Sequence, residues 1–113
     1  MDDIDDMDTI GHWVGGKAVA GTSGRVAPVY DPAQGTQTAQ VAVASAAEVD
    51  DVVKVAVDAS LAWGESSLSR RAGALFRLRE LLDAHRDDLA AIVTRQHGKV
   101  LADAEGEVTR GLE

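Results

Sequence analysis

Arg110 is the side chain of this sequence with the clearest capacity to hold a small anion. It lies in Gly-Glu-Val-Thr-Arg-Gly-Leu-Glu, residues 106–113, within a helical pattern. Glu107 and Glu113 each lie three residues away, where a helix allows a surface ion pair worth about 0.2–0.5 kcal/mol. Alternatively, the planar guanidinium holds a substrate carboxylate in two parallel hydrogen bonds. The residues alone leave both interpretations open.

The other side chains that could do chemistry have ordinary structural explanations. His12, His85 and His97 lack the i,i+4 spacing typical of a zinc site. The chain has no cysteine, so it offers no thiolate nucleophile or ligand. Gly21 and Gly24 precede a predicted strand and not a helix, which argues against a phosphate-binding turn. We therefore expect no catalytic residue, no cofactor-binding residue and no metal ligand in this chain.

Short strands are predicted in the first part of the chain, before the helices that carry Arg110. Apolar pieces at 12–14 and 17–19 flank Gly15-Gly16, a pair suited to a tight hairpin. Residues 25–30 predict a third strand, which ends at the turn Asp31-Pro32-Ala33-Gln34-Gly35. A fourth strand is predicted from about Thr38, through Val41 and Val43.

Helices are predicted from Ser45 onward. Ser45 and Glu48 form a capping box, and the first helix ends at Trp63-Gly64. A second helix begins near Leu68 with Ser67 as its cap, and its pattern breaks around His85. A third helix is predicted to end at Gly98, which would be its C-cap residue. A fourth helical pattern runs from after Lys99 through Leu112.

Charge is concentrated at the N-terminus. The 113 residues carry 19 acidic and 11 basic side chains, for a net charge of −8. Without residues 1–9 the balance is fourteen acids to eleven bases, a net charge of −3. Residues 1–9 are therefore predicted to be an acidic disordered tail. The nearly balanced remainder argues against nucleic acid, and no apolar run suggests a membrane span or signal peptide, so a cytoplasmic location is expected.

Two features suggest a piece of a larger chain. The last helical pattern reaches Leu112 without a stop signal, and small hairpins normally need a larger sheet or a helix layer.

Several segments, in order, resemble the aldehyde dehydrogenase superfamily. His12 to Lys17 resembles its opening strand pair, and residues 28–35 resemble its Val-x-Asn-Pro-Ala-Thr-Gly turn, with Asp31 and Gln34 in place of Asn and Thr. Residues 41–50 resemble its next strand and first helix, and residues 63–76 its second helix. Residues 97–113 are most similar to the CoA-acylating methylmalonate-semialdehyde dehydrogenase branch.

The resemblance implies an α/β fold, α+β within this fragment. Residues 10–113 would then be an incomplete N-terminal part, at the edge of an NAD-binding domain. The parent enzyme would use NAD and CoA to oxidise a small semialdehyde in valine, pyrimidine or inositol catabolism. It would be a homo-oligomer, namely a tetramer. The nucleophilic cysteine and general-base glutamate would lie outside this chain.

The resemblance also assigns a role to Arg110. In the methylmalonate-semialdehyde branch, the arginine of the Arg-Gly-(Leu/Ile)-Glu motif helps to hold the substrate carboxylate, together with a second arginine that lies outside this chain. Two alternatives stay open: another aldehyde dehydrogenase subfamily, or a small non-enzymatic acidic helical module that binds a partner.

The 113-residue chain alone is expected to be inactive. It lacks a cysteine nucleophile and a dinucleotide-binding turn. We expect no NADH when the pure chain is mixed with NAD and an aldehyde, as followed by absorbance. Measurable NADH above a no-protein control would contradict this expectation.

Overall fold

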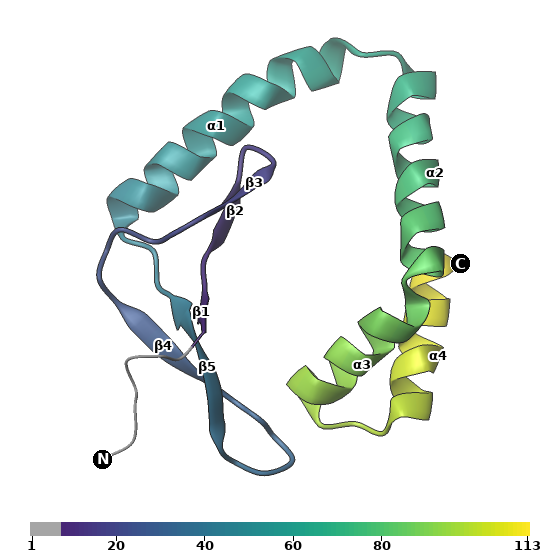
Figure 1. Ribbon diagram of the computed structural model, residues 1–113. Helices are drawn as coiled ribbons and strands as arrows, with labels where there is room; N and C mark the ends of the chain where they lie inside the picture. The colour runs from purple at the N-terminus through teal and green to yellow at the C-terminus, as the bar shows by residue number, and fades with distance from the viewer. Residues whose placement is uncertain (1–7) are drawn as a thin grey trace. The chain divides into compact units, whose positions relative to one another are not determined.

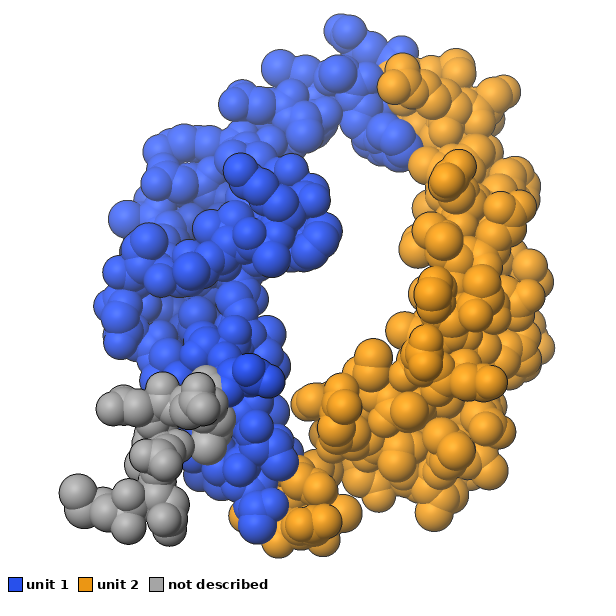
Figure 2. Space-filling view, in the orientation of Figure 1, with its two compact units in different colours: residues 1–30, 36–65 blue, residues 31–35, 66–113 orange. Residues whose placement is uncertain are grey.

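The computed structural model describes residues 8–113, and these form two compact units (Figures 1 and 2). The first unit holds the described residues up to Tyr30 together with residues 36–65. The second unit holds Asp31–Gly35 and Ser66–Glu113. None of the helices in the described residues is long and apolar enough to cross a membrane.

The first unit contains a three-stranded sheet. Its strands, in spatial order, are β1 (Thr9–Ile10), β5 (Gln37–Ala42) and β4 (Val26–Tyr30). β1 runs parallel to β5, with Thr9 opposite Gln40, whereas β4 is antiparallel to β5. The register between β4 and β5 shifts between Val29 and Tyr30.

A separate hairpin joins β2 (His12–Val14) to β3 (Lys17–Val19). Its turn residues, Gly15 and Gly16, have φ angles of 60° and 81°. Both angles lie in the left-handed region that tight hairpin turns require, and glycine adopts it without steric cost. The predicted Gly-Gly hairpin is confirmed.

Helix α1 (Ala46–Glu65) begins at the predicted capping box. The amide of Glu48 donates to Ser45 Oγ at 3.2 Å, and the amide of Ser45 donates to Glu48 Oε2 at 2.8 Å. The other carboxylate oxygen, Oε1, accepts hydrogen bonds from the backbone amide and the hydroxyl of Thr22. One side chain therefore both starts α1 and fixes the loop that precedes β4.

The second unit is helical, with α2 (Leu68–Ala84), α3 (Arg86–His97) and α4 (Leu101–Leu112). Ser67 Oγ accepts from the amide of Arg70 at 3.2 Å, which confirms the predicted cap of α2. α2 ends and α3 begins on either side of His85, where the predicted break lies. Gly98 ends α3 with a φ of 80°, as predicted.

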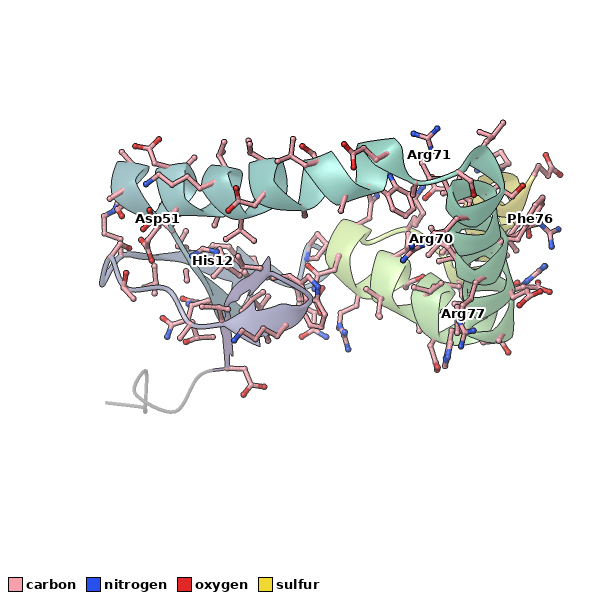
Figure 3. The ribbon with its side chains drawn as sticks, turned by 90° about the horizontal axis from the view of Figure 1, so that it is seen from above. His12, Asp51, Arg70, Arg71, Phe76 and Arg77 are labelled. Carbon is pink, nitrogen blue, oxygen red and sulfur yellow. The ribbon has the colours of Figure 1, made fainter. Side chains whose placement is uncertain are left out.

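The buried core is small. Ala90 on α3 and Ala104 on α4 are fully buried, and Leu112 is 7% exposed. The larger apolar side chains are mostly exposed: Leu61 on α1 is 68% exposed, and Phe76 on α2, labelled in Figure 3, is 66% exposed. α1 has no buried residue at all.

The mixed α/β class is confirmed, with differences at element ends. The third predicted strand begins at Val26 and not at Arg25, and the fourth spans Gln37–Ala42 and does not include Val43. Strand β1 was not predicted, because two residues carry no readable alternation. Thr9, predicted to end the acidic tail, lies in β1, and residues 1–7 of that tail lie outside the described residues.

Protonating Glu48 should release both the start of α1 and the loop at Thr22. The amide of Ser45 first, and then the amide and hydroxyl of Thr22, lower the pKa of Glu48 from 4.5 to about 2. Because the folded pKa is depressed, this stabilisation is present above pH ~4.5 and is lost as the pH falls toward about 2. In a pH series of NMR spectra of the chain, the Thr22 amide shift should therefore move with a midpoint near 2.

The Glu48→Gln variant is the control, since it has no carboxylate to titrate. We expect its Thr22 amide shift to lack this transition. A midpoint near 4.5 in the unaltered chain would show that Glu48 does not hold the loop.

Candidate functional site

Arg110 lies in the last turn of α4, and its side chain is exposed. A Cβ atom built on Gly106 would lie 3.5 Å from Nη1 of Arg110. The guanidinium therefore lies beside Gly106, one turn back toward the start of α4, as helical side-chain directions favour. Within residues 8–113, neither Glu107 nor Glu113 forms an ion pair with Arg110 at 4.0 Å or less.

The end of α4 that carries Arg110 is fixed by two arginines. Arg79 on α2 donates from Nε to the carbonyl oxygen of Leu112 at 3.0 Å, so it satisfies one of the unpaired carbonyls at the helix end. Arg86 at the start of α3 donates from Nη1 to Thr109 Oγ1 at 3.3 Å and from Nη2 to Asp83 at 2.7 Å. The neighbours of Arg110 on both sides are thus held.

Glu107 is paired with Lys99, which lies just before α4. Nζ of Lys99 donates a hydrogen bond to Oε1 of Glu107. The Lys99 side chain is 21% exposed and that of Glu107 is 42% exposed. The hydrogen bond from Lys99 is the main cause that lowers the pKa of Glu107, while Arg110 and His97 contribute less through their charge. The carboxylate nearest to Arg110 along the helix is therefore occupied by another cation.

Lys99 is oriented by the turn between α3 and α4. Gly98 adopts the left-handed conformation, and its amide donates to the carbonyl of Thr94 at 2.8 Å. A Cβ atom at Gly98 would lie 3.1 Å from Cγ of Pro32. Pro32 belongs to a turn in which Asp31 Oδ1 accepts from the amide of Ala33 at 2.8 Å. The side-chain oxygen of aspartate accepts such a bond as that of asparagine does.

The sequence made Arg110 a candidate but did not reveal the residues that hold its helix end. Arg79 lies 33 residues from Leu112, Arg86 lies 23 residues from Thr109, and Lys99 lies 8 residues from Glu107. No local pattern connects positions so far apart. The surface pairing weighed for Arg110 and Glu107 is replaced by the pair between Lys99 and Glu107.

The first unit has an open groove of about 380 Å³ between the β2–β3 hairpin and α1, near His12 and Asp51 (Figure 3). Its lining is mainly apolar, with Val14, Val52 and Val55 among the side chains. The carboxylate of Glu48, at its edge, is already used by the capping box and Thr22. The groove therefore offers no arranged catalytic pair.

The described residues do not form a metal site or a dinucleotide-binding turn. Across residues 8–113, no group of three His, Asp or Glu side chains could hold a metal ion. A pyrophosphate site of the doubly wound type needs a glycine-rich turn from a strand into a helix N-terminus. The strand-to-helix connection in this part of the chain, from β5 to α1, has no glycine, and Glu48 occupies that helix N-terminus. NAD does not fit these residues, so we place no step of its chemistry on them.

The fold and the sequence together define the class of protein. Residues 18–113 match the model of the aldehyde dehydrogenase family, so the chain belongs to this family. In the solved structures that resemble it, this chain corresponds to the N-terminal part of an aldehyde dehydrogenase.

The similar proteins include dehydrogenases of malonate-type semialdehydes. Malonate-semialdehyde dehydrogenase 3 of Geobacillus kaustophilus is 44% identical over 105 residues, which cover 93% of this chain and 22% of that protein. A solved structure from Sinorhizobium meliloti 1021, described as a methylmalonate-semialdehyde dehydrogenase complexed with NAD, is 40% identical with a TM-score of 0.89. It covers 94% of this chain and 22% of that one. The methylmalonate-semialdehyde dehydrogenase of Oceanimonas doudoroffii is 34% identical, with a TM-score of 0.80, over 94% of this chain and 22% of that one.

Two predictions of the sequence are confirmed by these comparisons. The family resemblance is confirmed, and so is the similarity to the malonate and methylmalonate-semialdehyde dehydrogenases. The chain spans about 22% of the length of the curated relatives that it matches.

Replacing Gly98 with alanine should loosen the turn that carries Lys99. A left-handed backbone costs a residue with a Cβ about 1–2 kcal/mol, and the added methyl would press on Pro32. We expect Gly98→Ala to lower the temperature at which the chain loses helix, measured by far-UV circular dichroism. Gly73→Ala is the matched control: it lies within α2 with nothing within 4 Å of a Cβ, so it should raise that temperature. Equal shifts in the two variants would contradict this account of the turn.

Proposed function

We propose that this chain is the N-terminal part of an NAD-dependent aldehyde dehydrogenase that acts on a malonate-type semialdehyde. We propose further that Arg110 binds the carboxylate of that substrate. The observation that carries the proposal is the state of Arg110: it is exposed, has no ion pair within the described part of the chain, and lies on a helix end held from both sides.

The chemistry of the substrate supports this assignment. A malonate-type semialdehyde carries a carboxylate close to its reacting aldehyde carbon. Anchoring the carboxylate in a planar guanidinium fork fixes both the position and the orientation of the aldehyde. Propanal has the aldehyde without the carboxylate, so it gains nothing from the fork. Arg110 would therefore act in substrate selection, while the bond-changing steps use groups outside this chain.

The exposure of apolar side chains supports a place within a larger enzyme. Leu61, Leu75 and Phe76 are each more than 60% exposed, and α1 buries no residue. Exposed apolar surface of this extent favours burial against further protein. We propose that the rest of an aldehyde dehydrogenase covers these faces, as the 22% coverage of the curated relatives supports.

The finer features of the parent enzyme rest on the resemblance. NAD as the hydride acceptor is supported by the NAD complex of the Sinorhizobium meliloti protein. CoA as the acyl acceptor and a tetrameric assembly are proposed from the same branch of the family.

The choice of substrate does not follow from the fold. A 3,6-anhydro-L-galactose dehydrogenase structure is similar with a TM-score of 0.86 at 27% identity, over 93% of this chain and 22% of that one. The same backbone therefore occurs in enzymes whose substrates differ, and another subfamily is the second candidate. What favours a carboxylated aldehyde is the higher identity to the malonate-semialdehyde enzymes, together with an Arg110 that has no ion pair in the described part of the chain.

Arg110→Leu in the whole enzyme tests the proposal. The variant removes a charge-assisted bond worth about 1.5–3 kcal/mol, or roughly ten- to a hundredfold in kcat/KM. We expect that loss with malonate semialdehyde or methylmalonate semialdehyde in steady-state assays of NADH formation. With propanal, the activity should change little or improve.

Arg110→Lys is the conservative comparison. An ammonium keeps the charge but lacks the planar fork, so it should restore the lost activity only in part. Equal losses of kcat/KM on the carboxylated aldehyde and on propanal would mean that Arg110 acts through stability, and would remove it from the substrate site.

A further inference from the structure

We propose that Lys99 is a specificity-determining positioning residue: by holding the carboxylate of Glu107, it keeps the guanidinium of Arg110 available for the substrate carboxylate. This inference rests on the proposed role of Arg110. It adds residues to which neither the sequence motif nor the family match gives a role.

The first step is the geometry of α4. Glu107 and Arg110 are three residues apart on one helix, a spacing at which opposite charges normally pair. An internal carboxylate and a substrate carboxylate have the same chemistry, so both would compete for the same fork. When an arginine spends part of its time in an internal ion pair, its apparent affinity for a ligand is its intrinsic affinity multiplied by the fraction of time that it is unpaired.

The second step is how that competition is avoided. Nζ of Lys99 donates a hydrogen bond to Oε1 of Glu107, and the Lys99 side chain is only 21% exposed. The guanidinium of Arg110 lies beside Gly106 instead, with Nη1 3.5 Å from the position of a Cβ built there. The carboxylate of Glu107 is therefore satisfied by Lys99, and among residues 8–113 the guanidinium of Arg110 has no ion-pair partner.

The other charged side chains near Glu107 also leave Lys99 as its partner. Arg79 is engaged with the carbonyl of Leu112, and Arg86 with Thr109 and Asp83, so neither is a competing partner for Glu107. His97 acts on Glu107 only through its charge. Loss of Lys99 would leave Arg110 as the nearest cation on the same helix.

A double-mutant cycle in the whole enzyme tests the inference. In Lys99→Met, Glu107 becomes free to pair with Arg110, and we expect KM for malonate semialdehyde to rise about two- to fivefold, the range that a helical ion pair of this spacing supports. The kcat should change little, because the chemistry is untouched. KM for propanal should rise less than KM for malonate semialdehyde, since propanal does not use the fork.

Glu107→Gln tests whether Glu107 competes with the substrate carboxylate for Arg110 or acts only through its negative charge. In the presence of Lys99 this variant should shift KM for malonate semialdehyde by less than twofold, because Glu107 is already occupied. In the Lys99→Met background the same change should restore KM, because the competitor is removed. Lys99→Arg keeps a cation at this position and should resemble the unaltered enzyme; this variant also reports on folding if Lys99→Met is poorly produced.

Two outcomes would overturn the inference. If Lys99→Met and Glu107→Gln shift KM in opposite directions and their effects add in the double variant, only net charge is at work. If Lys99→Met lowers kcat equally on both aldehydes, Lys99 has a structural role alone. Arg110→Leu, measured in parallel, tells the two proposals apart. A selective loss there together with an additive cycle would leave the carboxylate site standing and reject the role of Lys99.

Discussion

The packing of α3 against α4 is the contact on which the geometry of the candidate site depends. Ala90 and Ala104, one on each helix, are fully buried, and side chains this small let two helices approach closely. That approach brings Thr109 within reach of Arg86 at the start of α3. The last turn of α4 then ends against Arg79 of α2. A larger residue at either alanine would separate the helices and with them the groups that hold Arg110 in place.

Four basic side chains around α4 have different tasks, although their charge is the same. Arg79 donates to the backbone carbonyl of Leu112. Arg86 donates to the Thr109 hydroxyl and to the Asp83 carboxylate, so both arginines use directional N–H groups to hold neighbouring elements together. Lys99 is a compact ammonium, and it neutralises Glu107. Arg110 alone of these four has no hydrogen bond or ion pair within the described part of the chain. Of the four, only Arg110 is therefore left with its charge unpaired among the described residues, at the ordered end of α4.

Local features of the fold could be predicted from the sequence, and contacts between distant residues could not. The capping box of Ser45 and Glu48, the Gly15-Gly16 turn and the left-handed Gly98 each depend on residues within a few positions of one another. The second task of Glu48, holding Thr22 from 26 residues away, left no pattern to read. The same holds for β1, whose pairing with β5 joins residues about 30 positions apart. For the site, the motif and the family resemblance led to Arg110, but the partner of Glu107 depends on how the Gly98 turn directs Lys99.

The environment of Arg110 decides what its charge can do. In the 113-residue chain the side chain is exposed, and an exposed ion pair with a small carboxylate gains at most about 1 kcal/mol, because water solvates both partners. A site closed by further protein has a lower effective dielectric, where the same two hydrogen bonds gain more and an unpaired carboxylate is costly. The exposed apolar faces of α1 and α2 are surfaces that such protein would cover. Protein that covered those faces would bury the apolar side chains that this chain leaves in water. Protein that also closed over Arg110 would turn a solvated arginine into an anion site. It would also sharpen the need for Lys99, since an unpaired Glu107 beside the site would compete for Arg110 more strongly there than in water.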